Sequence, residues 1–342
     1  MNHTNPTQII HDRNELIQGP APECLQVMRT FPTEKVFSYP DGYYGSTLVP
    51  VLAQRYGLAA QNIIISSGAE GLLEHIFNWL KPGETVLTQY YRYRYYTFAL
   101  KHRNVELATF AMHEGDTSFT FDVEDCIRQL KALNPRLLLL TSPNNPTGNV
   151  LSIDDLQRIL KNVGPETLVI LDEAYWGFDT TYNEQAMLDI LHQTPNLILA
   201  RTFSKYYGLA GLRMGYALCG SNVINLLHYQ PPFLGFCRIA EAMCLAALDA
   251  QDYYKTTAQQ VISERERIIT ELTSLPHVKV FHSQANMVLT KLTEAADAAL
   301  SAILPTLPVV TIRKDHGTYW RISVGTEALN TPLLKVLKGL PQ

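Results

Sequence analysis

The stretch NLILARTFSKYYGLAGLRMGYALCG, residues 196–220, joins two apolar runs through a loop that is broken by glycines. Lys205 directly follows Ser204 in this loop, and Arg213 comes eight residues after the lysine. A lysine on such a turn is most often a solvated surface residue. Whether Lys205 has a chemical role therefore depends on what the rest of the chain places beside it.

Short apolar runs recur along the chain and alternate with helical patterns. They are NIIIS (62–66), TVLTQ (85–89), RLLLLT (136–141), TLVILD (167–172) and NLILA (196–200). Strands that are buried on both faces are expected in a mostly parallel sheet covered by helices. Residues 69–80 follow the three-and-four spacing of one buried helical face, and KPG at 81–83 ends that helix. The pattern predicts an α/β fold.

The character of the sequence changes near residue 238, where two long helical patterns are followed by short alternating segments. This change predicts a smaller α+β domain. A chain of 342 residues, at roughly 150 residues per domain, is expected to form two domains. The predicted layout is a large α/β domain at 36–245, a small domain at 246–342, and an N-terminal segment, 1–35, that joins the small domain.

Composition argues against several classes of function. A formal net charge of −4 disfavours a nucleic-acid binder, because a phosphate-tracking surface needs an excess of lysine and arginine. The five cysteines form no C-x-x-C pair, so we predict no metal site and no disulfide framework, and a cytoplasmic location. The N-terminus lacks the apolar core of a secretory signal, and no apolar segment approaches the ~20 residues that span a bilayer. We therefore expect no membrane partner.

Four features follow the predicted strands, at the sheet edge where ligands collect in such folds. SGAEG (67–71) opens a helix, whose free N–H groups favour a phosphate, and SPNNPTG (142–148) forms a tight turn with two asparagines. Asp172 and Glu173 end a buried strand, where a carboxylate needs a cation or hydrogen-bond donors. The fourth feature is the loop that carries Lys205. Each alone has a plain structural explanation, such as a glycine turn, an ion pair or a surface lysine.

Together these features describe a site for a phosphorylated, cationic ring that carries an aldehyde. The helix N-terminus, Ser204 and Arg213 would hold the phosphate. Lys205 would form an imine with the aldehyde, and Asp172 would pair with a protonated ring nitrogen. That ring is pyridoxal phosphate (PLP), which is the cofactor we predict.

The same motifs, with ILDEAYWGF at 170–178 and YWRISVGT at 319–326, resemble the fold-type I aminotransferases of class I and II. The resemblance is closest to the histidinol-phosphate aminotransferase subfamily and runs from residue 14 to residue 326. It implies the α/β fold of PLP-dependent transferases of fold type I, with a mostly parallel seven-stranded sheet and a small α+β domain. It also implies a ping-pong aminotransferase that takes a small amino donor and a 2-oxo acid acceptor such as 2-oxoglutarate.

The resemblance assigns roles to individual residues. Lys205 would be the Schiff-base lysine that removes the α-proton, and Asp172 the partner of the ring nitrogen. Asn145 and Tyr175 would bind the 3-oxygen of the ring, and Tyr93, within YYRYRYY (90–96), would stack on the ring. The phosphate cup would consist of Gly68, Ala69, Glu70, Thr202, Ser204 and Arg213.

Other positions concern the substrate and the second subunit. Arg321 and Arg313 match anion-binding arginines of the family, and a forked guanidinium suits a carboxylate or a phosphate. Gln18 stands in NELIQG (14–19), where histidinol-phosphate enzymes often carry a tyrosine, so this segment departs from the family pattern and leaves the substrate open. Tyr39 matches the position that reaches the phosphate of the neighbouring subunit, which implies a homodimer with shared sites.

Three alternative functions stay open on the sequence. A threonine-phosphate decarboxylase shares the motifs, and an aromatic amino acid aminotransferase could use the tyrosine-rich run. An aminotransferase-like sensor of a transcription regulator would need a DNA-binding segment in front, and only ~40 residues precede the first motif. Arg92 and Arg94 have no assigned role, and two cations beside the pocket could favour an acidic substrate.

Overall fold

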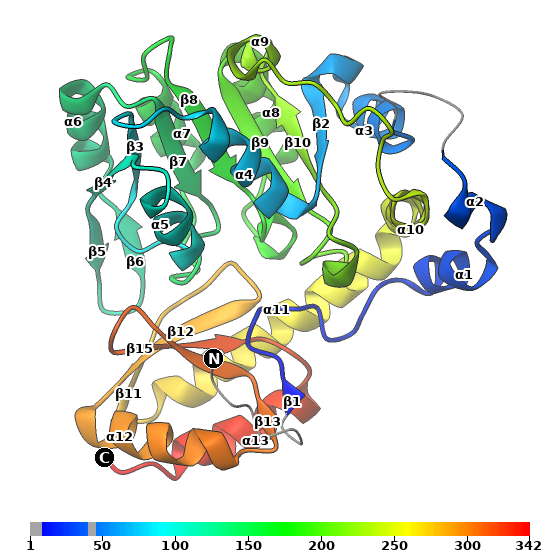
Figure 1. The fold of residues 1–342 in the computed structure, drawn as a ribbon. Coiled ribbons are helices and arrows are strands. Elements are labelled where there is room, and N and C mark those ends of the chain that lie inside the picture. Colours follow the sequence, from blue (N-terminus) through cyan, green and yellow to red (C-terminus); the bar gives the residue numbers. More distant parts are fainter. Residues whose placement is uncertain (1–8, 40–45) are drawn as a thin grey trace.

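The computed structural model describes residues 9–39 and 46–342. Within these ranges two main sheets are each covered by helices, one sheet in the upper part of Figure 1 and one in the lower part. The long helix α11 (Gln251–Thr273) runs from the upper part to the lower part. In the described ranges, no helix is both long and apolar enough to cross a membrane.

The upper sheet has seven strands in the order β2-β10-β9-β8-β7-β3-β4. Strand β10 is antiparallel to both neighbours, and the other pairs are parallel, so the predicted mostly parallel seven-stranded sheet is confirmed. Edge strand β4 was not among the runs expected from the sequence, because most of its side chains are only half-buried and its pattern is weakly apolar. The bounds are β2 (Ile63–Ser66), β3 (Thr85–Gln89), β4 (Glu106–Phe110), β7 (Leu137–Thr141), β8 (Leu168–Asp172), β9 (Leu197–Thr202) and β10 (Gly215–Cys219).

Helices cover both faces of this sheet, and buried aliphatic side chains fill the space between. The helix expected at 69–80 is α4, which buries its apolar face as the spacing predicts. Because the central strands are buried on both faces, they form two separate apolar clusters, one on each face of the sheet. The helices are α3 (Leu48–Tyr56), α4 (Gly68–Trp79), α5 (Arg94–Lys101), α6 (Val123–Leu133), α7 (Ile153–Leu160), α8 (Glu184–Gln193), α9 (Val223–Leu227) and α10 (Arg238–Asp249).

The lower sheet is antiparallel, with four strands in the order β11-β12-β15-β14. Its alternating segments and the two long helices before it match the expected change of character near residue 238. The domain boundaries themselves stay a prediction. The elements are β11 (Val278–Val280), β12 (Met287–Leu292), β14 (Ile312–Asp315), β15 (Tyr319–Ser323), α12 (Glu294–Ile303) and α13 (Glu327–Lys338).

The N-terminal segment contacts both parts of the molecule. Strand β1 (Ile9–Ile10) pairs in parallel with β13 (Val309–Val310), beside the lower sheet. Helix α1 (Pro22–Thr30) packs on α10, and the short helix α2 (Glu34–Phe37) follows it. Residues 11–21 therefore pass between the two sheets (Figure 1).

A hairpin of β5 (Met112–Glu114) and β6 (Phe119–Phe121) extends from the upper part and contacts the lower sheet. Glu114 pairs with Lys279 at 2.8 Å and Lys291 at 3.3 Å, and accepts a hydrogen bond from the Tyr319 hydroxyl. Phe119 packs on Phe281, with ring centroids 4.7 Å apart. The hairpin thus joins the two sheets on the side away from α11.

Candidate functional site

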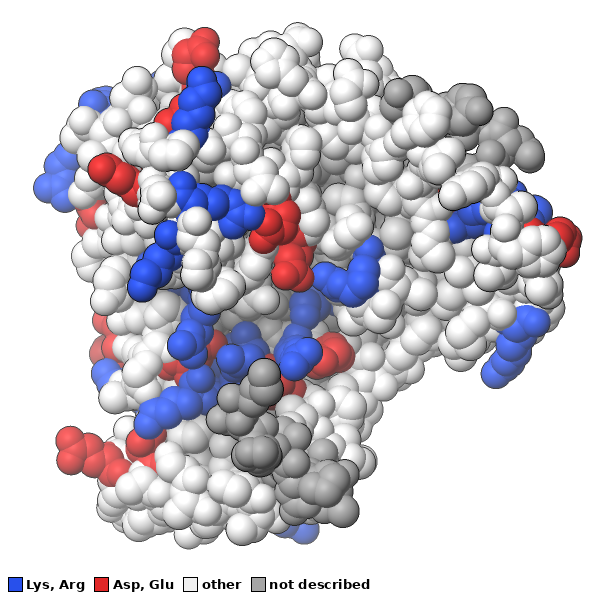
Figure 2. All heavy atoms as spheres, viewed as in Figure 1, with Lys and Arg blue, Asp and Glu red and all other residues white. Residues whose placement is uncertain are grey.

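A cavity of about 490 Å³ lies at the carboxyl ends of β7, β8 and β9 and is faced by side chains from β14 and β15. Among the described residues, five cationic and three acidic side chains line it, so its wall carries excess positive charge. Figure 2 shows basic side chains gathered in the hollow between the upper and lower parts. The cavity brings together Ala69, Glu70, Tyr93, Asn145, Asp172, Tyr175, Thr202, Ser204, Lys205, Arg213, Arg313 and Arg321.

Asp172 is a buried carboxylate at the end of β8. Its Oδ2 accepts a hydrogen bond from the Tyr96 hydroxyl at 2.6 Å, and its Oδ1 accepts one from the Ala174 backbone N–H at 3.0 Å. Burial raises the pKa of Asp172, and the two hydrogen bonds act in the opposite direction. The carboxylate is therefore prepared to receive a cationic or proton-bearing group from the cavity.

The neighbouring carboxylate, Glu173, points to the opposite face of the sheet. It accepts a hydrogen bond from Arg201 Nε at 2.8 Å, and both side chains are buried. Because successive side chains on a strand alternate between faces, only one of the two adjacent carboxylates can face the cavity. Glu173 thus has the structural role of an ion pair.

Lys205 reaches the cavity from the loop after β9. Its Nζ donates a hydrogen bond to the backbone oxygen of Arg13 at 2.6 Å. Burial lowers the pKa of Lys205 to about 8, and the nearby Glu15 carboxylate opposes that shift. A lysine with this pKa is partly neutral near physiological pH, so its amine is available as a nucleophile or a base.

Tyr175 is held by two amides. Asn14 Nδ2 and Asn145 Nδ2 each donate a hydrogen bond to the Tyr175 hydroxyl oxygen at 3.1 Å. Because both neighbours are donors, the hydroxyl's own proton is left for an acceptor in the cavity. Burial raises the pKa of Tyr175 to about 12, so that proton stays in place at neutral pH.

Arg213, Ser204 and the start of α4 form a cradle for an anion. Arg213 Nη1 donates to Ser204 Oγ at 3.3 Å, and Arg213 Nη2 donates to Glu70 at 3.2 Å. A Cβ at Gly68, which has a φ of +72°, would approach Arg213 Nη2 to 2.9 Å, so glycine is required there. The N-cap residue Ser67 makes no side-chain hydrogen bond to the first turn of α4, which leaves those N–H groups for a ligand.

Two arginines of the lower sheet complete the wall. Arg321 is buried, donates to Asn145 Oδ1 at 2.8 Å and to the Asp12 backbone oxygen at 2.6 Å, and lies 4.0 Å from the Asp315 carboxylate. Arg313 lies 3.8 Å from the Asp12 carboxylate. The Nε atoms of both arginines are buried without a hydrogen-bond partner among the described residues. Each guanidinium therefore keeps hydrogen-bonding capacity that the described residues do not use.

Three predicted residues do not line this cavity, and the first, Gly68, directly precedes the lining residue Ala69. Gln18 is half-buried outside it, and its Oε1 has no hydrogen-bond partner among the described residues. Tyr39 is 76% exposed and also lies away from the cavity of its own chain. Residues 40–45, which follow Tyr39 in the motif, lie outside the described residues.

The structure adds four residues that sequence reasoning did not select: Arg13, Glu15 and Tyr96 in the cavity wall and Asn14 behind Tyr175. Asn14 is fully buried, and its Oδ1 accepts a hydrogen bond from Ser323 Oγ at 2.8 Å. Asn14 opens the NELIQG segment, from which only Gln18 was selected, and its partners lie more than 150 residues away in the chain. Tyr96 stood in the tyrosine-rich run, from which only Tyr93 was selected.

Comparisons with known proteins agree with this geometry. A family model for aminotransferase class I and II matches residues 13–337. Histidinol-phosphate aminotransferase 2 of Caulobacter vibrioides is 32% identical over 95% of this chain and 84% of its own length. The crystal structure of histidinol-phosphate aminotransferase from Sinorhizobium meliloti in complex with pyridoxal-5'-phosphate superposes with a TM-score of 0.84 at 26% identity, covering 96% of this chain and 90% of that chain. L-threonine-O-3-phosphate decarboxylase from Porphyromonas gingivalis shares the fold, with a TM-score of 0.80 at 20% identity over 96% of this chain and 98% of that one.

The lowered pKa of Lys205 gives the first prediction. In cofactor-free protein, reaction of Lys205 with an amine-selective acylating reagent should rise with pH and reach half its maximum near pH 8. The reason is that burial disfavours the ammonium form, so the neutral amine appears as pH rises through this value. Peptide mass spectrometry after brief labelling measures it, with urea-unfolded protein as the control. A Lys205 profile that coincides with that of the unfolded control would contradict the prediction.

Asn14 gives the second prediction. Asn14→Ala should lower the free energy of unfolding by about 2 kcal/mol, because the hydroxyls of Tyr175 and Ser323 each lose a buried partner. Part of the loss comes from the backbone, since Asn14 has a φ of +57°. Asn14→Gly tolerates the positive φ, so it should recover only the backbone share of the lost free energy of unfolding. Urea unfolding of both variants separates the two causes, and full recovery by glycine would show that the hydrogen bonds contribute nothing.

Proposed function

The chain belongs to the class I and II aminotransferases, and we propose that it transfers the amino group of histidinol phosphate to 2-oxoglutarate. It is a PLP-dependent transaminase with the α/β fold of that family. The Caulobacter relative named for this substrate supports the proposal, as does the excess of positive charge around the cavity. The observation that carries most weight is the convergence of Lys205, Asp172 and the anion cradle on one cavity.

The residues of the cavity fit PLP. Asp172 is a buried carboxylate that can face a protonated pyridine nitrogen, and Tyr175 has a hydroxyl proton left for the ring oxygen. The cradle of Arg213, Ser204 and the α4 N–H groups suits a phosphate. Thr202 supports it, because its Oγ1 accepts a hydrogen bond from the Ser204 backbone N–H at 3.1 Å. Tyr93 lines the same space and offers a ring face for stacking.

In this proposal the chain moves one proton and holds the reactants. PLP, when bound, supplies a ring that accepts electrons from the substrate Cα–H bond. The Lys205 amine would anchor the cofactor until the amino donor displaces it. The freed amine would then take the proton from the substrate Cα and deliver it to the carbon that carried the cofactor's aldehyde. The Asp172 carboxylate keeps the facing nitrogen protonated. Asn145 and Tyr175 hold the ring oxygen.

Arg321 and Arg313 would bind the acidic groups of the two substrates. Both guanidinium side chains line the cavity, and their forked geometry suits a phosphate or a carboxylate. The only carboxylate within 4.0 Å of Arg321 in the described residues is Asp315, so its charge is incompletely balanced. Both a phosphate ester and 2-oxoglutarate meet this requirement in alternate halves of a ping-pong cycle.

We also propose a homodimer with shared sites, located in the cytoplasm. Exposed Tyr39 lies away from its own cavity, as a residue that completes a neighbouring site would. All five cysteines are free, as is usual in a reducing compartment.

Replacing the anchoring lysine is the direct test of the mechanism. Lys205→Ala should lower turnover at least ~1,000-fold, because the variant lacks both the anchor and the base. Lys161→Ala, at the opposite edge of the sheet, removes the same functional group without touching the cavity and should retain activity. Transamination assayed with added PLP measures both variants. Normal turnover in Lys205→Ala would exclude the assigned role.

The substrate is tested by the absorbance spectrum of the loaded enzyme without any oxo acid. Histidinol phosphate should remove the visible band of the bound cofactor, because amino transfer converts the aldehyde to an amine that absorbs at shorter wavelength. Threonine phosphate and phenylalanine serve as comparisons. Conversion by phenylalanine alone would assign an aromatic aminotransferase, and carbon dioxide release from threonine phosphate would assign a decarboxylase.

A further inference from the structure

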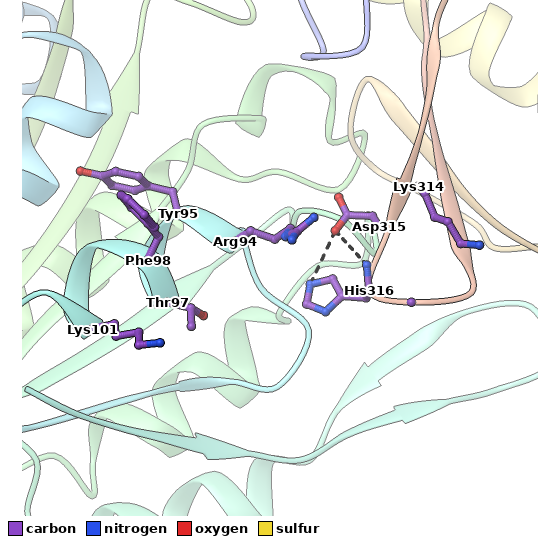
Figure 3. A pocket seen from close by; sticks show the side chains of 9 residues that line it. Arg94, Tyr95, Thr97, Phe98, Lys101, Lys314, Asp315 and His316 are labelled. Carbon is purple, nitrogen blue, oxygen red and sulfur yellow. Dashed lines mark hydrogen bonds and ion pairs between the residues drawn. The ribbon is translucent and has the colours of Figure 1, made fainter. Parts of the chain in front are cut away.

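A groove of about 850 Å³ lies between α5 and the turn that joins β14 to β15. One wall consists of Arg94, Phe98 and Lys101, which follow one another on a single face of α5. The other wall is residues 314–317. Figure 3 shows Arg94 extending from the start of α5 toward Asp315 and His316, with Lys101 at the other end of the helix.

Arg94 and Lys101 have no hydrogen-bond or ion-pair partner among the described residues, and both are exposed. Other cations nearby are engaged. Lys314 pairs with Asp297 at 2.7 Å, and Arg92 donates to the Tyr90 backbone oxygen at 2.7 Å. The groove therefore offers two uncompensated positive charges, separated along the helix by about 10 Å.

The acidic residue of the groove does not cancel these charges. Asp315 is buried, lies 4.0 Å from Arg321, and accepts a hydrogen bond from the His316 backbone N–H. Its carboxylate thus lies between Arg321 of the cofactor cavity and the His316 imidazole of the groove, whose Nε2 is 3.9 Å away, and forms no ion pair with Arg94 or Lys101. Between the two free cations lies Phe98, which is 66% exposed and presents an apolar surface for a small planar group.

The groove is a neighbour of the cofactor cavity through two sequence junctions. Tyr93 lines the cavity and Arg94 lines the groove, while Arg313 lines the cavity and Lys314 the groove. Arg94 of the groove therefore directly follows, in the chain, a residue of the cavity wall, Tyr93. Arg313 and Arg321 are the cationic side chains that the lower sheet contributes to that cavity.

We propose that the groove is a capture site for the anionic group of the substrates, where Arg94 and Lys101 hold a phosphate or a second carboxylate before it passes to Arg313 and Arg321. This inference rests on the proposed function for the phosphate-bearing donor. Free cations beside a cavity raise the local concentration of an anionic ligand and its association rate. Capture therefore acts on kcat/KM and leaves kcat unchanged.

The test compares Arg94→Gln/Lys101→Gln with the wild-type enzyme at low and high salt. With histidinol phosphate at low ionic strength, kcat/KM of the double variant should fall roughly three- to tenfold, with kcat unchanged. The difference should shrink below about twofold near 0.5 M salt, because screening shortens the reach of both charges. Lys131→Gln/Lys161→Gln removes the same total charge from the opposite edge of the sheet and should behave as wild type.

Equal kcat/KM of the Arg94/Lys101 variant and the wild type at low salt would overturn the proposal, as would an equal loss in the control variant. If histidinol phosphate proves not to be a substrate, the proposed donor fails, and the groove is tested on the other half-reaction. Enzyme loaded with the amino form of the cofactor is then mixed with dianionic 2-oxoglutarate or monoanionic pyruvate. A salt-sensitive loss that is larger for 2-oxoglutarate supports capture, and no loss excludes it.

Discussion

The desolvation of one carboxylate constrains the rest of the structure. Asp172 is buried at the end of a strand that is itself covered on both faces, where an unpaired charge would cost several kcal/mol. The Tyr96 hydroxyl and the Ala174 N–H offset part of that cost, and the proposed cationic ring would offset more of it. Lys205, the anion cradle and the arginines of the second sheet all surround this point. Within the protein, the Lys205 side chain is the cation that favours the charged form of Asp172.

Adjacent positions on one strand serve unrelated purposes because of the alternation of side chains. Glu173 binds Arg201 inside the core, while Asp172 faces the cavity. The same alternation separates Arg313 from Lys314 on β14, whereas Tyr93 and Arg94 are separated at the start of helix α5. At these positions, a step of one residue along the chain moves a side chain from the wall of the cavity to the wall of the groove.

Strand periodicity made much of the fold and half of the site predictable. The carboxyl ends of parallel strands meet at one edge, so the sequence alone predicts that Asn145, Asp172 and Lys205 lie together. Asn14 could not, because its contacts to Tyr175 and Ser323 depend on how the N-terminal segment threads between the two sheets. Edge strand β4 was missed because its half-buried pattern resembles that of a loop. The position of Gln18 outside the cavity depends, like the contacts of Asn14, on the path of the N-terminal segment.

The β5–β6 hairpin connects the upper part of the molecule to the lower sheet through side-chain contacts. Glu114 and Phe119 hold the hairpin against the lower sheet, which carries Arg313 and Arg321, and the Arg321–Asn145 hydrogen bond joins the two parts at the cavity itself. A hairpin longer or shorter by one residue would widen or narrow the cavity without changing any residue that lines it. Because no residue of this hairpin lines the cavity, engineering of cavity size on this scaffold can begin at a segment outside the cavity wall.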